Sequence, residues 1–147
     1  MISMSGPLEA GAYFDALYRA LSNSPTHAEV GREAVGGAFV GQLGYAGEEE
    51  LFRLAELAGI GSGRHLLELC CGTGGVSVWF ARQTGSSVLG VDCSRVGLNM
   101  GSLTARATPE VDVKFVLGDI DTLPFAQATF DALVCLDGFG ALFSKIF

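Results

Sequence analysis

Four carboxylates, each at the end of an apolar run, are the side chains in this sequence best suited to holding a polar ligand. They are Glu68, Asp92, Asp119 and Asp137. Between the first two lies a glycine-rich turn, residues 72–75, where the backbone can bend sharply and approach a ligand with no Cβ in the way. A turn of this kind, with a strand before it and a helix after it, is typical of a nucleotide-cofactor site.

The spacing of these residues narrows the choice of cofactor. Asp92 stands about 20 residues beyond the turn, where a carboxylate that binds both hydroxyls of a ribose is expected. A dinucleotide-binding turn also needs a third glycine where helix and strand pack most closely, and this sequence has Ser77 there. Because serine is small, this departure weakens the prediction of a nicotinamide cofactor but leaves it open.

Apolar runs and glycines predict the elements that would position these acids. The run from Leu66 to Leu69 indicates a buried parallel strand that ends at the turn. The helix after the turn would direct its N-terminal amides toward the ligand. Helices are expected over residues 48–58, 76–83 and 94–108, and further strands over residues 88–92, 113–120 and 130–137.

Taken together, these segments resemble the class I S-adenosylmethionine-dependent methyltransferases. Glu68 followed by the glycine turn resembles motif I of that family, an acid followed by x-G-x-G. Asp119 and Ile120 match the acid and the apolar neighbour that contact the adenine, while residues 121–125 and 130–137 match the family's acid-x-L-P-F connection and its fourth strand. The resemblance implies an α/β fold, a Rossmann-like parallel sheet with strand order 3-2-1-4 flanked by helices.

The resemblance also implies S-adenosylmethionine as the cofactor and suggests a place for each part of it. The turn would wrap the methionine portion near Glu68, Asp92 would hold the ribose, and Cys93 would lie beside the adenine. Leu136 and Asp137 would line the space between cofactor and acceptor. The predicted cofactor-binding residues are Glu68, Cys70, Gly72, Thr73, Gly74, Asp92, Cys93, Asp119, Ile120 and Leu136.

Two features depart from the family pattern. Cys70 stands where the family most often has the first glycine of motif I. Methyltransferases of the quinone-biosynthesis type resemble this chain in having a cysteine at that position. The chain also ends at Phe147, whereas the family fold continues with three more strands and their helices. We therefore expect a truncated domain in two regions, an N-terminal helical lid over residues 1–62 and a cofactor-binding half-domain over residues 63–147.

In such a half-domain the fourth strand would lie at the edge of the sheet. Its apolar run, residues 132–136, would be unpaired on one side. Natural proteins seldom leave such an edge open. We expect a second copy of the chain, a separate chain or the N-terminal region to cover it.

The region before the glycine turn should cover the site. Residues 8–22 have apolar groups at helical spacing, in a stripe that includes Ala12 and Ala16. In related methyltransferases, aromatic residues of N-terminal helices close over the ligands. By this resemblance, Tyr13 or Tyr18 would cap the cofactor or the acceptor.

A glycine-rich segment, residues 36–45, follows this helical region. It resembles a Gly-x-x-Gly-Tyr entry of methyltransferases of the sarcosine and dimethylglycine type, which would place Gln42 or Tyr45 near the cofactor. His27 lies where a lid could bring it toward an acceptor as a general base. No catalytic residue is assigned by the sequence, and the candidates are Asp137, Tyr18 and His27.

Composition excludes several kinds of partner. The net charge of −7 disfavours nucleic acid, because phosphate contacts need a basic surface, and favours a small-molecule acceptor. The four cysteines include no C-x-x-C pair, so no metal site is expected. No run has the length of a membrane span and the start lacks the pattern of a signal peptide, so we expect a cytoplasmic protein that does not bind membranes.

Three functions remain open at this point. The first is a methyltransferase whose missing half is replaced by an oligomer or a partner. The second is a non-catalytic module that binds S-adenosylmethionine, and the third is a nicotinamide-dependent oxidoreductase. Binding preference separates the third from the others, and methyl transfer separates the first from the second.

Overall fold

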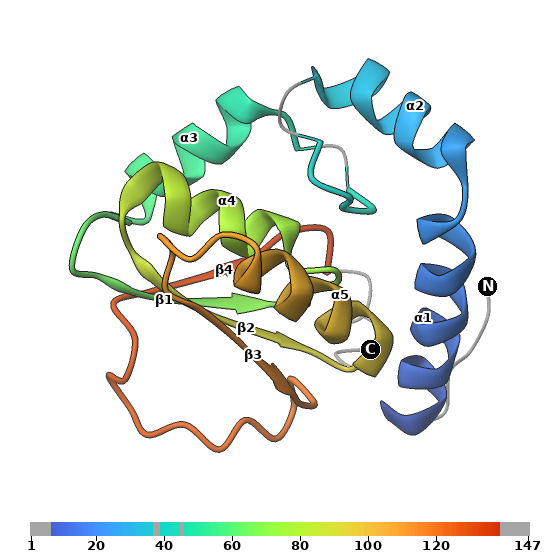
Figure 1. Ribbon diagram of the computed structural model, residues 1–147. Helices are drawn as coiled ribbons and strands as arrows, with labels where there is room; N and C mark the ends of the chain where they lie inside the picture. Colours follow the sequence, from blue (N-terminus) through green and yellow to red (C-terminus); the bar gives the residue numbers. More distant parts are fainter. Residues whose placement is uncertain (1–6, 37–38, 45, 139–147) are drawn as a thin grey trace.

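The structure is a computed structural model that describes residues 7–36, 39–44 and 46–138. Helices and strands alternate after an all-helical N-terminal region (Figure 1). The helices are α1 (Pro7–Ser22), α2 (Pro25–Val35), α3 (Glu48–Leu57), α4 (Gly75–Thr84) and α5 (Arg95–Arg106). The strands are β1 (His65–Leu69), β2 (Ser87–Asp92), β3 (Val113–Leu117) and β4 (Ala132–Cys135).

The four strands form one parallel sheet in the order β3-β2-β1-β4. This confirms the order expected from the sequence. Leu69, the last residue of β1, pairs with Val91 of β2 and with Cys135, the last residue of β4. The strand order reverses between β1 and β4, and ligands of open parallel sheets bind beyond the carboxyl ends of the strands at such a point.

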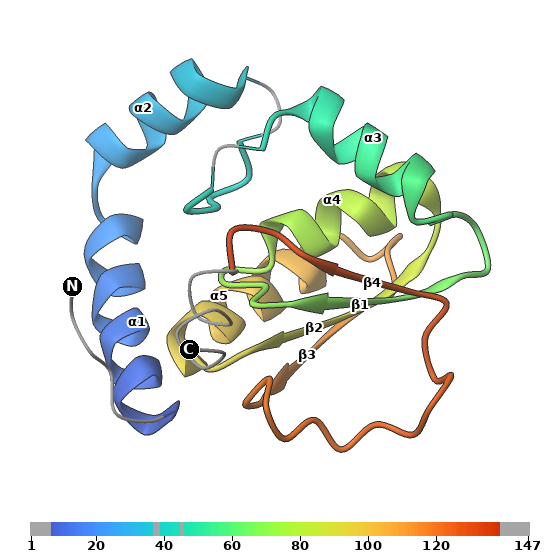
Figure 2. The same ribbon diagram turned by 180° about the vertical axis from the view of Figure 1, so that it is seen from behind.

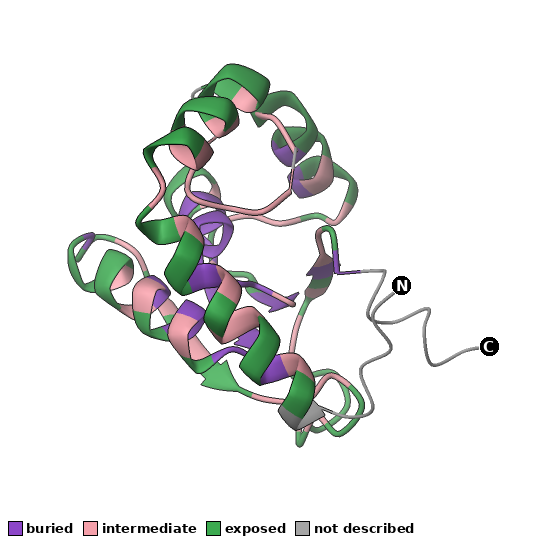
Figure 3. Ribbon diagram, turned by 90° about the vertical axis from the view of Figure 1, so that its right-hand side faces the viewer, coloured by how far each residue is buried: buried purple, intermediate pink, exposed green. Residues whose placement is uncertain are grey.

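The two faces of the sheet are covered differently. Helices α3, α4 and α5 all lie over one face, and the long connection between β3 and β4 lies over the other (Figures 1 and 2). On the helical face a core forms around Leu66, Phe80 and Leu51. On the opposite face the core is smaller, and the aromatic pair Phe125 and Phe130 packs against the strands from the connection. The burial pattern reflects this, because α4 and the central strands are buried while α1 and α2 expose most of their surface (Figure 3).

Helix α2 is an element that the sequence analysis did not predict. Its N-terminus is stabilised by Ser24, whose hydroxyl accepts a hydrogen bond from the backbone N–H of His27 at 3.3 Å. Pro25 occupies the first turn, where a missing N–H costs nothing. The described residues of α2 include none that is buried, so no apolar stripe marked the helix in the sequence.

The apolar stripe expected on α1 is only partly buried. Ala12 and Ala16 are exposed, whereas Gly11 and Tyr18 are buried. The small apolar residues have helical spacing but lie on the solvent side. The face that packs on α5 contains Gly11, which lies close to the Cys93 carbonyl, and the large Tyr18 ring. The strands also end earlier than expected, with β3 ending at Leu117 and β4 at Cys135.

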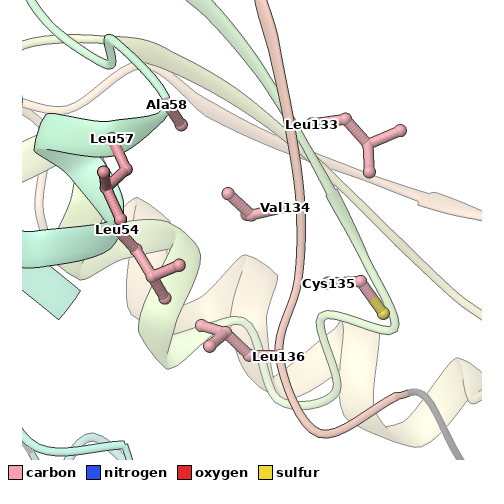
Figure 4. A pocket seen from close by; sticks show the side chains of 7 residues that line it. All are labelled: Leu54, Leu57, Ala58, Leu133, Val134, Cys135 and Leu136. Carbon is pink, nitrogen blue, oxygen red and sulfur yellow. The ribbon is translucent and has the colours of Figure 1, made fainter. Parts of the chain in front are cut away.

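Strand β4 lies at the edge of the sheet, as expected. An apolar groove runs between it and α3 (Figure 4). Val134 and Leu136 point toward α3, while Leu133 points away from it and is 55% exposed. Among the described residues, the groove is lined by Leu54, Leu57, Ala58, Leu133, Val134, Cys135 and Leu136.

Candidate functional site

The loop between β1 and α4 forms the floor of the candidate site. Three of its residues have left-handed backbone conformations, with φ of 56° at Cys70, 56° at Gly72 and 71° at Gly74. The loop is held at both ends, because the Cys71 N–H donates to the carbonyl of Val91 in β2 at 3.1 Å and the Gly74 N–H donates back to the Cys71 carbonyl at 2.9 Å. The backbone of the loop therefore crosses the carboxyl ends of β1 and β2.

Asp92, the last residue of β2, joins this loop to the start of α5. One carboxylate oxygen accepts the Gly72 N–H at 2.8 Å, and the other accepts the Ser94 N–H at 2.8 Å. The side chain is only 6% exposed, and burial raises the pKa of its carboxyl while these N–H donors act in the opposite direction. A buried carboxylate is thus fixed at the position that the sequence predicted for a ribose contact.

Two glycines allow the loop to pack against β3 and α5. A Cβ on Gly74 would overlap the ring of Phe115, which lies beneath the loop on the helical face of the sheet. A Cβ on Gly97, in the first turn of α5, would lie 2.7 Å from the Gly72 carbonyl oxygen. These contacts show why a side chain at Gly74 or Gly97 would push the loop away from β3 or α5. Phe115 supports the loop from below, a role that the sequence analysis missed.

Glu68 lies beneath the floor of the site. Its side chain is 2% exposed and its carboxyl accepts a hydrogen bond from the Ser77 hydroxyl of α4. Burial raises the pKa of Glu68 to about 8, and the hydrogen bond from Ser77 only partly offsets this. In this structure the acid of motif I therefore ties β1 to the first turn of α4, and it is mostly protonated at neutral pH.

Helix α1 forms one wall of the site. The Tyr18 ring lies against the glycine loop, and its hydroxyl would be 2.7 Å from a Cβ on Gly72. Burial, together with the nearby Asp92 carboxylate, raises the pKa of the Tyr18 hydroxyl. The sequence candidate Tyr18 is therefore inside the site, whereas Tyr13, on the same helix, is largely exposed.

Asp15 holds α1 in this position. Its carboxylate accepts hydrogen bonds from the Ser94 hydroxyl at 2.6 Å and from the Val96 N–H at 2.9 Å, at the N-terminus of α5. The Ser94 hydrogen bond is the main reason that the pKa of Asp15 is lowered. The sequence analysis missed this residue. The spacing of Gly11, Asp15 and Tyr18, four and three residues apart, could have indicated a shared helix face.

The segment before α3 forms the other wall. The Thr73 hydroxyl donates to the Gly41 carbonyl at 3.2 Å, and a Cβ on Gly75 would overlap the Val40 carbonyl oxygen. A Cβ on Gly44 would overlap the Asp137 carboxylate, so this segment also contacts the second residue after β4. Residues 39–44 therefore lie across the loop from α1.

Within this segment, the Gln42 side chain is used locally. Its amide oxygen accepts the Val40 N–H at 2.7 Å. Tyr45, the other residue that the sequence suggested near the cofactor, lies outside the described residues. A position near the cofactor stays a prediction for both residues.

The residues expected at the adenine end lie beyond β2 and β3. Cys93 follows Asp92, and burial raises the pKa of its thiol to about 11, with smaller contributions from the Asp92 and Asp119 carboxylates. Asp119 accepts the Asp121 N–H at 3.1 Å, and Ile120 packs against the core on the face away from the helices. Cys93 and Asp119 thus lie near one another beyond β2 and β3, and their contact with an adenine stays a prediction.

Other candidates are not gathered at the floor of the site. The His27 ring packs edge to face with the Phe39 ring, with the ring centroids 5.6 Å apart. His27 therefore contacts the segment of residues 39–44. Leu136 packs against the helical-face core and lines the groove beside α3. Asp137, with a φ of 57°, lies between the wall segment and the carboxyl end of β4.

The described residues were expected to hold no metal centre and no membrane span. In residues 7–36, 39–44 and 46–138, no three or more histidine, cysteine or acidic side chains gather as a metal ion would require. Within the same part of the chain, no helix has the length and apolar character needed to cross a bilayer.

Comparisons with known proteins agree with this geometry. The family model described as "Methyltransferase domain" matches residues 66–145. The chain is 30% identical over 133 residues to methyltransferase GfsG of Streptomyces halstedii, an alignment that covers 88% of this chain and 47% of GfsG. It is 37% identical over 89 residues to the demethylmenaquinone methyltransferase of Thermobifida fusca, covering 59% of this chain and 37% of that protein.

A solved structure shows the same arrangement of elements. It is a SAM-dependent methyltransferase from Thiobacillus denitrificans in complex with S-adenosyl-L-homocysteine, with a TM-score of 0.53 and 25% sequence identity. The match covers 61% of this chain and 36% of that one. The chain thus spans about half the length of GfsG and little more than a third of the other two proteins. Since the family match includes the strands and the loop that build the site, the chain belongs to the class I S-adenosylmethionine-dependent methyltransferase family.

Proposed function

We propose that this chain binds S-adenosylmethionine at the carboxyl ends of its strands and takes part in methyl transfer to a small molecule. The observation that carries the proposal is the buried Asp92 carboxylate, which is fixed by the N–H groups of Gly72 and Ser94. It combines a ribose-binding acid at the end of β2 with a glycine loop whose backbone is open to a ligand.

The residues present suit this cofactor. The left-handed loop offers backbone atoms without Cβ atoms at Gly72 and Gly74, which suits the methionine portion, and Asp92 retains lone pairs for the ribose hydroxyls. We assign Cys93 and Asp119, which lie near one another, to the adenine end of the cofactor. Bound here, S-adenosylmethionine would supply an electrophilic methyl group on a sulfonium centre.

The two walls would exclude water and align the acceptor. Transfer between sulfur and an acceptor atom depends chiefly on positioning, because the reacting atoms must lie in line in a dry site. Tyr18 already covers Gly72, and the wall segment already contacts Thr73 and Asp137. We assign to Tyr18 the covering of the cofactor and to Asp137 the orientation of the acceptor, with His27 as the remaining candidate base.

Several observations support a small-molecule acceptor. The net charge of −7 opposes binding to nucleic acid. The curated relative from Thermobifida fusca is named for demethylmenaquinone, a small molecule. We also propose that residues 1–62 act as the lid and residues 63–147 as the cofactor-binding half.

We expect the acceptor pocket beside β4, which is an edge strand among the described residues. Leu133 and the groove beside α3 expose an apolar edge, and the chain spans about half the length of GfsG. We propose that a second copy of this chain or a separate chain covers this edge and completes the acceptor pocket. An edge strand without prolines or charged residues is otherwise a site of unwanted pairing.

Methyl transfer from labelled S-adenosylmethionine tests the proposed function. The purified chain is incubated with the labelled cofactor and a cell extract, which is then separated into small molecules and macromolecules. We expect label in the small-molecule fraction, and at least a tenfold loss of label for Asp92→Asn, because a hydrogen bond to a charged group contributes about 1.5–3 kcal/mol. Asp131→Asn, which alters an exposed carboxylate paired with Arg64, is the matched control and should retain activity.

The other outcomes identify the alternatives. Label in protein or nucleic acid would overturn the small-molecule acceptor. Binding of S-adenosylmethionine with no transfer would favour a non-catalytic module. Binding of NAD in its place would favour the oxidoreductase, which the family membership already disfavours.

A further inference from the structure

Two cysteine side chains meet at the carboxyl ends of β1 and β4. Cys135 is the last residue of β4, in register with Leu69, and Cys70 is the residue that follows Leu69. The two sulfur atoms lie 2.7 and 2.8 Å from a single point, the position that a Cβ would occupy on Gly138. Both side chains are half-buried, and the two thiols are close enough for each to affect the pKa of the other.

We propose that Cys70 and Cys135 form an oxidisable dithiol, which a hydroperoxide converts to a disulfide that ties the end of β1 to the end of β4. The position is suitable because the strands are hydrogen-bonded neighbours, so the backbones are close enough for an S–S bond of about 2.05 Å. This inference does not depend on cofactor binding.

The environment of Cys135 favours it as the attacking thiol. The hydrogen bond from the Cys70 thiol and a second from the Gly138 N–H lower the pKa of Cys135 to about 7. The Cys135 thiol therefore ionises more readily than an ordinary cysteine thiol. In contrast, burial raises the pKa of the Cys71 and Cys93 thiols, so these remain protonated.

Two thiols and one peroxide are the only reactants in the oxidation. The Cys135 thiolate attacks the peroxide oxygen, the O–O bond breaks, and the sulfur becomes a sulfenic acid while hydroxide leaves and takes up a proton. The Cys70 sulfur then attacks the Cys135 sulfur, forming the S–S bond and releasing the sulfenic oxygen as water with the Cys70 proton. Two thiols are oxidised by two electrons, and one peroxide is reduced.

The disulfide would affect a crowded part of the site. Gly138 is buried against both sulfur atoms and has no room for a side chain, and Asp137 beside it contacts the wall segment. The bond would therefore fix the start of the glycine loop to the segment that leads out of β4. A thiol pair at this point gives the site a means of responding to peroxide.

Peptide mapping under non-reducing conditions tests the inference. The reduced chain is treated with one equivalent of hydrogen peroxide, the remaining thiols are alkylated, and the protein is cut with trypsin. Cleavage at Arg64, Arg82, Lys114 and Lys145 places Cys70 and Cys71 in one peptide and Cys135 in another. We expect these two peptides to be joined within one chain, at a rate that rises with pH around 7.

Single variants identify the cysteines. The cross-link should persist in Cys71→Ser, which removes the neighbouring buried thiol, and should be absent in Cys70→Ser. In Cys70→Ser, Cys135 should instead accumulate as a sulfenic acid that a dimedone-type reagent traps. A cross-link that survives in Cys70→Ser, one that forms only between chains, or peroxide treatment that leaves Cys135 alkylatable would overturn the inference.

Discussion

At the residue scale, two buried carboxylates perform different tasks under the same loop. Asp92 accepts hydrogen bonds from backbone N–H groups at the floor of the site. Glu68 lies deeper, and among the described residues its carboxyl accepts a side-chain hydrogen bond from the Ser77 hydroxyl. Each is buried, but the donors around Asp92 favour its charged form more strongly. Glu68 and Asp92 therefore differ in position and in the number of hydrogen-bond donors that act on each carboxyl.

Glu68→Gln should change how stability depends on pH. A carboxyl whose pKa is about 8 in the folded chain, against 4.5 as its usual value, is bound to its proton more tightly in the folded state. Its stabilising effect is therefore complete below about pH 4.5 and is lost as the pH rises through 8. We expect the free energy of unfolding of the unaltered chain to fall relative to Glu68→Gln by up to about 1.4 kcal/mol per pH unit in this range.

Urea unfolding of both proteins between pH 5 and pH 9 measures this difference. Because Asp92 and the thiols titrate in both, their contributions cancel in the comparison. Parallel pH profiles for the two proteins would show that Glu68 is ionised in the folded chain.

The sequence predicted some of these residues and missed others for a physical reason. Asp92 and the glycines of the loop were predicted because their spacing along the chain is fixed by one strand, one turn and one helix. Asp15 and Phe115 were missed because their roles depend on contacts between elements far apart in the sequence. That any of the predicted binding residues, Asp92 and the loop glycines included, contact a cofactor stays a prediction.

At the element scale, the site is a loop enclosed by two walls. Strand β1 and helix α4 present the loop, and α1 and residues 39–44 lie on either side of it. The strands were predictable because their apolar runs are short and end at acids or glycines. The buried face of α1 was not, because it is determined by contact with α5 and not by hydrophobicity.

Asp15→Ala should release α1 from α5. The carboxylate accepts two hydrogen bonds at the N-terminus of α5, where a negative charge is also favourable. Because the residue is only partly buried, we expect a loss of about 1 kcal/mol in unfolding free energy and faster amide hydrogen exchange across α1. Ala16→Ser, on the exposed face of the same helix, is the control.

Hydrogen exchange measured by mass spectrometry reports on α1 separately from the sheet. Unchanged protection of α1 in Asp15→Ala would show that other contacts hold the helix. Equal loss of protection in β1 and β2 would show that the substitution unfolds the whole domain and does not release one wall.

At the scale of the whole molecule, the sheet has helices on one face and a connecting segment on the other (Figures 1 and 2). The strand order and the place of β4 at the end of that order were predicted from the family resemblance, and both are observed in the described residues. What covers the edge could not be predicted, because an apolar strand does not specify its partner. The groove beside α3 shows that the N-terminal region approaches the edge but leaves Leu133 exposed.

Leu133→Lys should reduce association through this edge. Leu133 and Leu57 are 55% and 68% exposed, and a charge on an edge strand discourages further pairing. We expect the unaltered chain to self-associate or to bind an apolar dye, and the variant to do both less, with a change in unfolding free energy of about 0.5 kcal/mol or less. Sedimentation and dye fluorescence measure the two effects.

Leu103→Lys provides the comparison for surface charge alone. Leu103 is 66% exposed on α5, on the helical face and away from the β4 edge. Equal effects of the two variants would assign the behaviour to net charge. A monomeric chain with little dye binding would contradict the proposed coverage by another chain.

The most direct test of the central claim is a calorimetric titration of the purified chain with S-adenosylhomocysteine, repeated with NAD. A cofactor site built on Asp92 and the glycine loop predicts saturable binding of S-adenosylhomocysteine, none of NAD, and at least tenfold weaker binding by Asp92→Asn. Binding of NAD alone, or binding of S-adenosylhomocysteine that Asp92→Asn leaves unchanged, would contradict the account. Absence of binding to either would mean that this chain does not assemble the site by itself.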